Sequence, residues 1–111
     1  MDGSDKLDRA RDAIVQAAEA LLAGRIGVIE ASRTIAWNAH IIDPEMDDDE
    51  LLGFIGIESQ TDHLLVGPLL EEWHPSVREQ KRAEVGDAEA FHRNDAFHAA
   101  RALVERYRRA T

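Results

Sequence analysis

The chain has 111 residues, of which 44% are hydrophobic and 32% are charged, a composition typical of a single globular domain over residues 1–111. It carries 13 Lys and Arg against 22 Asp and Glu, a net charge of −9, and it has no cysteine. These numbers exclude disulfides and thiolate chemistry, and they argue against binding to nucleic acid or to anionic membranes, both of which need positive charge.

The first two predicted elements are helices joined by a short link. Apolar residues follow the helical period from about residue 5 to residue 22, with Ser4 or Asp5 as the N-terminal cap and Gly24 just past the end. A second helix covers about residues 26–40 and carries apolar residues on two lines, with Arg33 among them. The link Gly24-Arg25 is short, so we expect the two helices to pack antiparallel.

An acidic run follows the second helix. Asp43-Pro44 ends that helix, because the residue before a proline avoids the α region. Six of the eight residues from Asp43 to Glu50 are acidic. We interpret the run as the negative start of a third helix. A calcium site is the alternative, but the run lacks the glycine and the spaced aspartates of a calcium loop.

Residues 51–60 fit a helix or a buried strand, and the absence of a second strand candidate favours the helix.

The last predicted helix is long and runs from Pro75 to Arg109. Pro75 suits the first helical position, Ser76 and Glu79 fit a capping box, and Gly86 predicts a bend or a break. Its core-facing stripe is expected to include Val77, Val85, Ala88, Phe91, Ala96, Ala99, Leu103 and Tyr107.

The sequence thus predicts an all-α bundle of four or five antiparallel helices. Because the last helix exceeds what so small a core can cover, we expect a homodimer along its stripe.

One cluster of residues offers candidate chemistry. Glu58 and Asp62 lie four residues apart, His63 follows, and Trp73 comes shortly after. Two carboxylates one helical turn apart repel each other unless a cation lies between them, and Arg33 is the expected partner. We interpret this group as a buried network that fixes helix register, and as the candidate binding cluster. The alternative is a metal site or an acid–base pair, although no recognised metal-ligand spacing is present.

Further histidines and tryptophans have structural explanations. Glu89 and His92 lie three residues apart on the last helix, as in di-iron bundles, but a matching pair on a facing helix is not evident. We therefore predict neither a bound metal nor another cofactor, and keep this pair as a weaker alternative. Trp37 and Trp73 are expected to anchor the core or an interface.

The stretch Ile57-Glu58-Ser59-Gln60-Thr61-Asp62-His63-Leu64, with Gly67 and Trp73 after it, resembles a group of small uncharacterised bacterial helical proteins. That group carries an I-D/E-S-x-T-D-H-L-P-x-G stretch, a tryptophan and a long C-terminal helix. The resemblance also includes residues 27–33 and spans most of residues 26–109. Leu65 departs from it, because the group tends to have proline there. The resemblance implies a bacterial cytoplasmic protein and supplies no mechanism.

These observations predict a small acidic cytoplasmic protein that acts by protein–protein interaction. Its net charge favours a basic protein partner, and a toxin-neutralising immunity protein is one specific form of such a function. The alternative is a small metal-dependent or acid–base enzyme that uses Glu58, Asp62 and His63. Convergence of these three side chains on an open pocket would favour the enzyme.

Overall fold

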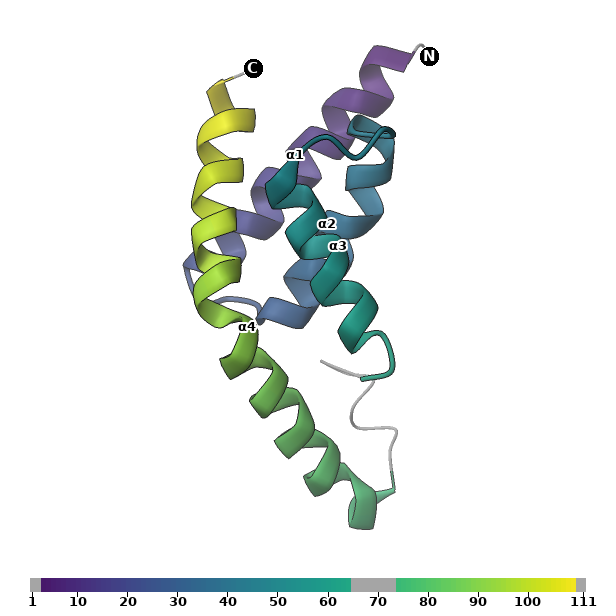
Figure 1. The fold of residues 1–111 in the computed structure, drawn as a ribbon, viewed down its shortest axis with the longest axis vertical. Helices are drawn as coiled ribbons and strands as arrows, with labels where there is room; N and C mark the ends of the chain where they lie inside the picture. The colour runs from purple at the N-terminus through teal and green to yellow at the C-terminus, as the bar shows by residue number, and fades with distance from the viewer. Residues whose placement is uncertain (1–2, 65–73, 110–111) are drawn as a thin grey trace.

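The computed structural model describes residues 3–64 and 74–109, which form four helices and no strand. α1 spans Gly3–Leu22, α2 spans Val28–Ile42, α3 spans Asp49–Thr61 and α4 spans Pro75–Arg109. Figure 1 shows the first three helices packed with the second half of α4, while the first half of α4 extends away from them. The predicted all-α bundle with a long C-terminal helix is confirmed. Among the described residues, no helix is long and apolar enough to cross a membrane.

The link between α1 and α2 turns at Gly24, as predicted. Gly24 has a φ of +76°, a conformation that residues with a Cβ rarely adopt. The Arg25 amide donates to the carbonyl of Ala20 at 2.9 Å, and the Gly24 amide donates to that of Leu21 at 3.0 Å. These bonds satisfy carbonyls at the end of α1 that would otherwise lack partners, and they direct the chain back along the bundle.

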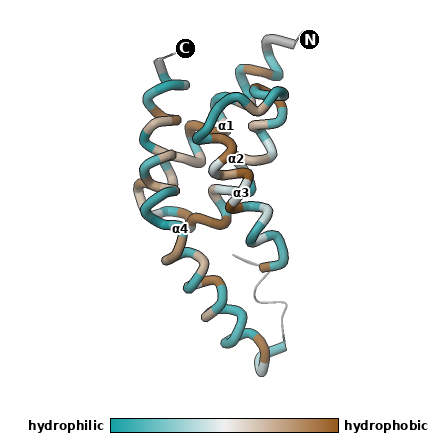
Figure 2. The backbone as a smooth tube through the Cα atoms, in the orientation of Figure 1, coloured by the Kyte–Doolittle hydropathy of each residue, from teal (hydrophilic) through white to brown (hydrophobic). Residues whose placement is uncertain are grey.

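Residues 51–60 are helical, which resolves the choice between helix and strand. Asp48 caps α3, because its side chain accepts hydrogen bonds from the amides of Glu50 and Leu51. Leu51 and Phe54 are fully buried, and they join the core formed with α1, α2 and α4. Figure 2 shows hydrophobic residues gathered where the bundled helices meet, whereas the first half of α4 is mainly hydrophilic.

The predicted core-facing stripe is wrong over the first half of the last helix, where Val77, Val85 and Ala88 are half-buried but lie outside the core. Ala96, Ala100 and Leu103 are buried, but Phe91 is 80% exposed. Phe91 precedes Ala100 by nine residues, or about two and a half turns, so its side chain points to the opposite side of α4. The helix continues through Gly86 without a break.

A polar cluster joins the start of α3 to the end of α4. Asp48 accepts hydrogen bonds from Arg106 at 2.5 Å and from the Tyr107 hydroxyl at 2.7 Å. Arg106 also donates to Glu50 at 2.7 Å. Asp43 accepts from the amides of Asp47 and Asp48, at 3.1 and 2.9 Å, and so shapes the preceding loop. We call Asp48, Glu50, Arg106 and Tyr107 the clasp. The acidic run therefore serves as a helix start, as predicted.

The clasp changes the proton affinity of its members. Partial burial raises the pKa of Asp48, but hydrogen bonds from Arg106, Tyr107 and the Leu51 amide outweigh that effect, so the pKa of Asp48 lies below its ordinary value. Burial and the hydrogen bond to Asp48 raise the pKa of Tyr107 to about 12. At neutral pH the clasp thus holds an ionised Asp48 and a protonated Tyr107.

Candidate functional site

The structure gives Arg33 a different partner from the predicted carboxylates. Arg33 donates to the backbone carbonyl of Thr61 at 3.1 Å and to that of Leu64. Carbonyls at the end of a helix have no intrahelical partner and carry partial negative charge, so they attract a guanidinium. Arg33 therefore caps α3 from α2. The expected pairing of Arg33 with Glu58 or Asp62 is wrong.

The other members of the predicted cluster are not joined to one another. Glu58 lies on α3 and is half-buried, while Asp62 and His63 follow the helix and are exposed. Within residues 3–64 and 74–109, no hydrogen bond or ion pair links these three side chains. The same ranges contain no group of three His, Asp or Glu side chains placed to hold a metal ion. Trp73, the fifth member, lies outside the described residues.

Glu89 has a role that the sequence did not suggest. Its carboxylate accepts hydrogen bonds from the amides of Val28, at 2.5 Å, and Ile29, at 3.2 Å. These amides belong to the first turn of α2, whose preceding residue, Gly27, makes no side-chain cap. A Cβ on Gly27 would lie 2.5 Å from Glu89 Oε1, so any larger residue there would displace the carboxylate from this position. Glu89 thus caps α2 from α4, and it lies with α2 rather than with His92.

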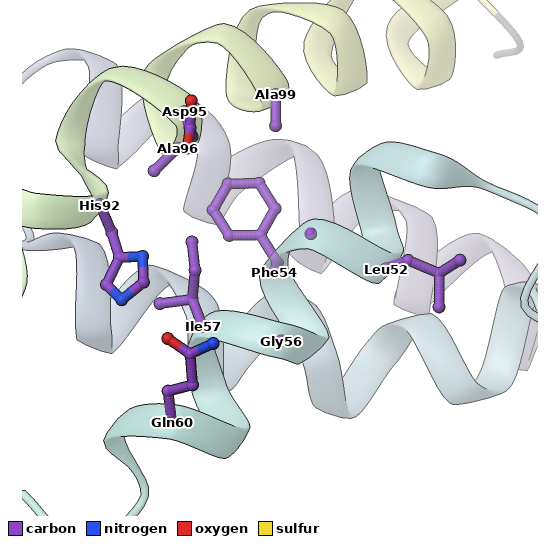
Figure 3. A pocket seen from close by; sticks show the side chains of 10 residues that line it. Leu52, Phe54, Gly56, Ile57, Gln60, His92, Asp95, Ala96 and Ala99 are labelled. Atoms are coloured by element: carbon purple, nitrogen blue, oxygen red, sulfur yellow. The ribbon is translucent and has the colours of Figure 1, made fainter.

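A groove with a largely apolar lining lies between α3 and α4. It holds about 230 Å³ of space. Its lining residues come from both helices: Leu52, Gly53, Phe54, Gly56, Ile57 and Gln60 from α3, and His92, Asp95, Ala96 and Ala99 from α4. Figure 3 shows His92 and Gln60 toward one end of the groove and Leu52 toward the other. We call this hollow the α3–α4 groove.

The two glycines of α3 keep the groove open. Gly53 and Gly56 occupy its α3 wall, and a Cβ on either would meet no heavy atom within 4 Å. The floor is apolar, since Phe54, Ile57 and Ala96 are 0%, 6% and 1% exposed. The groove can therefore receive an apolar group, and Gln60, His92 and Asp95 can hydrogen-bond to polar groups that lie beside it.

An exposed aromatic side chain lies beside the groove. Phe91 is next to His92, and their rings meet edge to face with centroids 4.9 Å apart. Asp95 lines the groove and lies one turn after Phe91 on the same side of α4, so Phe91 is adjacent to the groove wall.

A second aromatic residue, Trp37 on α2, is 76% exposed and so is not part of the core. Sequence periodicity missed the groove, because the glycines that leave it open give no signal in the local sequence.

Comparison with known proteins adds no relative from which a role could be transferred: no family model, no curated protein and no solved structure matches this chain.

Proposed function

We propose that this chain works by binding another protein, and that the α3–α4 groove is the contact surface. The observation that carries the proposal is the open apolar groove, because its floor is well packed and its glycine wall leaves space for a partner's side chains. A preformed concave surface of this kind costs little reorganisation on binding.

Phe91 supports the same function. Aromatic side chains supply much of the energy of protein interfaces, because each can bury a large apolar area. Phe91 is 80% exposed in a chain that has six aromatic residues, and its ring lies against His92 at the groove. A partner seated in the groove could extend over Phe91.

The acidic net charge favours a basic partner, and the specific form we propose is the neutralisation of a basic toxin, as an immunity protein does.

Site-specific photo-crosslinking in the native host tests this proposal. A photoreactive amino acid replaces Leu52, which lies at the groove and is 37% exposed. The control replaces Lys6, which is exposed on α1. We expect the Leu52 position to form a discrete adduct with one protein, which mass spectrometry then identifies, and the Lys6 position to form none.

A second change decides whether the adduct depends on the groove. Gly56→Leu places a side chain into the groove, while Gly86→Leu adds the same side chain on α4 at a site that is also open. We expect Gly56→Leu to abolish the adduct and Gly86→Leu to preserve it. An adduct that survives Gly56→Leu, or that forms equally from Lys6, would show that the groove is not the contact surface.

A further inference from the structure

We infer that the α3–α4 groove takes a single amphipathic helix whose polar face carries lysines or arginines. This inference rests on the proposed function and specifies the structure and the charge of the partner segment. Three features of the groove support it: the spacing of residues on its α3 wall, its volume, and its charge.

The α3 wall has the geometry of a helix-packing surface. Asp49, Gly53, Gly56 and Gln60 are separated by four, three and four residues, so they form one line along α3. The two glycines at the centre of the line allow a second helix backbone to approach closely, because they present no side chain. The opposing wall on α4 contains Ala96 and Ala99, which are also small. A helix lying along this line would contact α3 and α4 together.

The volume of the groove suits an anchoring side chain. An apolar cavity of about 150 Å³ is large enough to bind benzene. The groove holds about 230 Å³ above a floor that includes Phe54 and Ile57. One large apolar side chain from the partner helix therefore fits between Gly53, Gly56 and Ala99. An amphipathic helix presents such residues on one face at helical spacing.

The charges around the groove select the polar face of that helix. Asp95 lines the groove, Asp49 lies one turn before Gly53 on the α3 line, and Asp87 lies one turn before Phe91. None of the three carboxylates is engaged in an ion pair within the described parts of the chain. The groove lining includes neither lysine nor arginine. Arg106, close to the start of α3, already binds Asp48 and Glu50. A partner with cations flanking its apolar face would complement these carboxylates, whereas an acidic helix would be repelled.

Two synthetic peptides test this inference against the full chain. Both are helices of roughly 18 residues, or five turns, with the same leucines on one face. One carries lysines on its polar face, and the other carries glutamates at the same positions. Fluorescence anisotropy measures the affinity of each labelled peptide. We expect the lysine peptide to bind at least about tenfold more tightly than the glutamate peptide, with the difference decreasing at high salt.

Matched variants separate docking in the groove from general attraction to an acidic protein. Gly56→Leu fills the groove and should abolish binding of the lysine peptide, while Gly86→Leu should leave it unchanged. Asp95→Asn should weaken binding several-fold. Asp12→Asn removes the same charge from the exposed face of α1 and should have little effect. Circular dichroism confirms that each variant keeps its helical content, and Asp95→Asn keeps the test valid if Gly56→Leu fails to fold.

Three outcomes would overturn the inference. Equal effects of the Asp95 and Asp12 substitutions would mean that the peptide is attracted by net charge alone. Tighter groove-dependent binding of the glutamate peptide would refute the basic partner helix and leave the proposed contact surface intact. Self-association that Gly56→Leu abolishes would mean that a second copy of the chain occupies the groove. Failure of the proposed function itself is recognised separately, by a Leu52 crosslink that survives Gly56→Leu.

Discussion

Gly27 is the residue at which one added methyl group should disturb the contact between α2 and α4. Its backbone is extended, so alanine is conformationally allowed, but the added Cβ would lie 2.5 Å from Glu89 Oε1. We expect Gly27→Ala to displace the carboxylate and to lower the free energy of unfolding by about 1 kcal/mol, the typical value of a helix cap. Glu89→Ala should cost a similar amount, because the Val28 and Ile29 amides lose the same acceptor.

The double variant makes this prediction specific. If the methyl group acts only through Glu89, Gly27→Ala should cost nothing once Glu89→Ala is present. It could even stabilise slightly, since alanine restricts the unfolded chain. Urea denaturation of the four proteins measures the coupling between the two sites. If the destabilising effects of Gly27→Ala and Glu89→Ala simply add in the double variant, then Gly27→Ala does not act through loss of the Glu89 cap.

At the level of single residues, the sequence predicted local roles better than distant ones. Gly24 was predicted to end α1, and the acidic run to start a helix, because both roles depend on neighbours in the chain. Glu89 was expected to relate to His92, three residues away, but it binds amides about sixty residues away. Arg33 was expected to pair with a carboxylate, yet it binds the backbone carbonyls of Thr61, the last residue of α3, and of Leu64, just after it. Backbone acceptors have no signature in the sequence.

At the level of elements, the clasp fixes the start of α3 to the end of α4, and its tyrosine can be observed directly. Tyr107 is the single tyrosine of the chain, so the ultraviolet absorbance of tyrosinate reports this residue alone. We expect its ionisation to have a pKa of about 12, against an ordinary value of 10.0. Because the pKa is raised in the folded state, the stabilisation is complete below pH 10 and is lost as the pH rises through about 12.

Charge-matched variants identify the source of that shift. Asp48→Asn removes the negative charge that accepts from the Tyr107 hydroxyl, so the pKa of Tyr107 should fall toward its ordinary value. Asp47→Asn removes a charge from an exposed neighbour and should change it little. An unchanged titration in Asp48→Asn would contradict the clasp.

Asp48 gives the fold a second pH dependence, on the acid side. Because the pKa of Asp48 is lowered in the folded state, its ionised carboxylate stabilises the fold above pH 3.8, the ordinary pKa of an aspartate. This contribution is lost as the pH falls through the lower pKa of the folded state.

The elements themselves were predictable from caps, prolines and periodicity. The last helix begins at Pro75 and ends at Arg109 as predicted, and α3 begins at Asp49 within the acidic run. The face of α4 was harder to assign, since its apolar residues do not keep one helical phase over its whole length. Phe91 shows the consequence, because its distance from Ala100 places it away from the core.

At the level of the whole molecule, composition and pattern were sufficient for the fold but not for a site. A bundle needs apolar residues at the helical period, and that period is visible in one sequence. The α3–α4 groove depends on how two distant helices pack and on which side of α3 Gly53 and Gly56 face. The candidate cluster at Glu58, Asp62 and His63 joined residues that are neighbours in the chain, and the fold does not connect them.

The homodimer stays a prediction, and the packing of α4 indicates where its contact would lie. In the second half of α4, Ala96, Ala100 and Leu103 already serve the core of their own chain. In the first half, Val77, Val85 and Ala88 are half-buried and are not part of that core. Residues 75–88 form about 20 Å of helix at 1.5 Å per residue. So short a contact predicts a dimer that dissociates on dilution.

Static light scattering over a range of concentrations measures this equilibrium. At high concentration we expect a mass of twice 12.4 kDa, falling toward 12.4 kDa on dilution. Val85→Glu should shift the protein to the single-chain mass at all concentrations, because it puts a charge on the expected contact. Leu7→Glu makes a comparable change at a 40% exposed site on α1 and should leave the dimer intact. A single-chain mass at the highest concentration would rule out the dimer. A dimer insensitive to Val85→Glu would instead mean that the two chains meet on another surface.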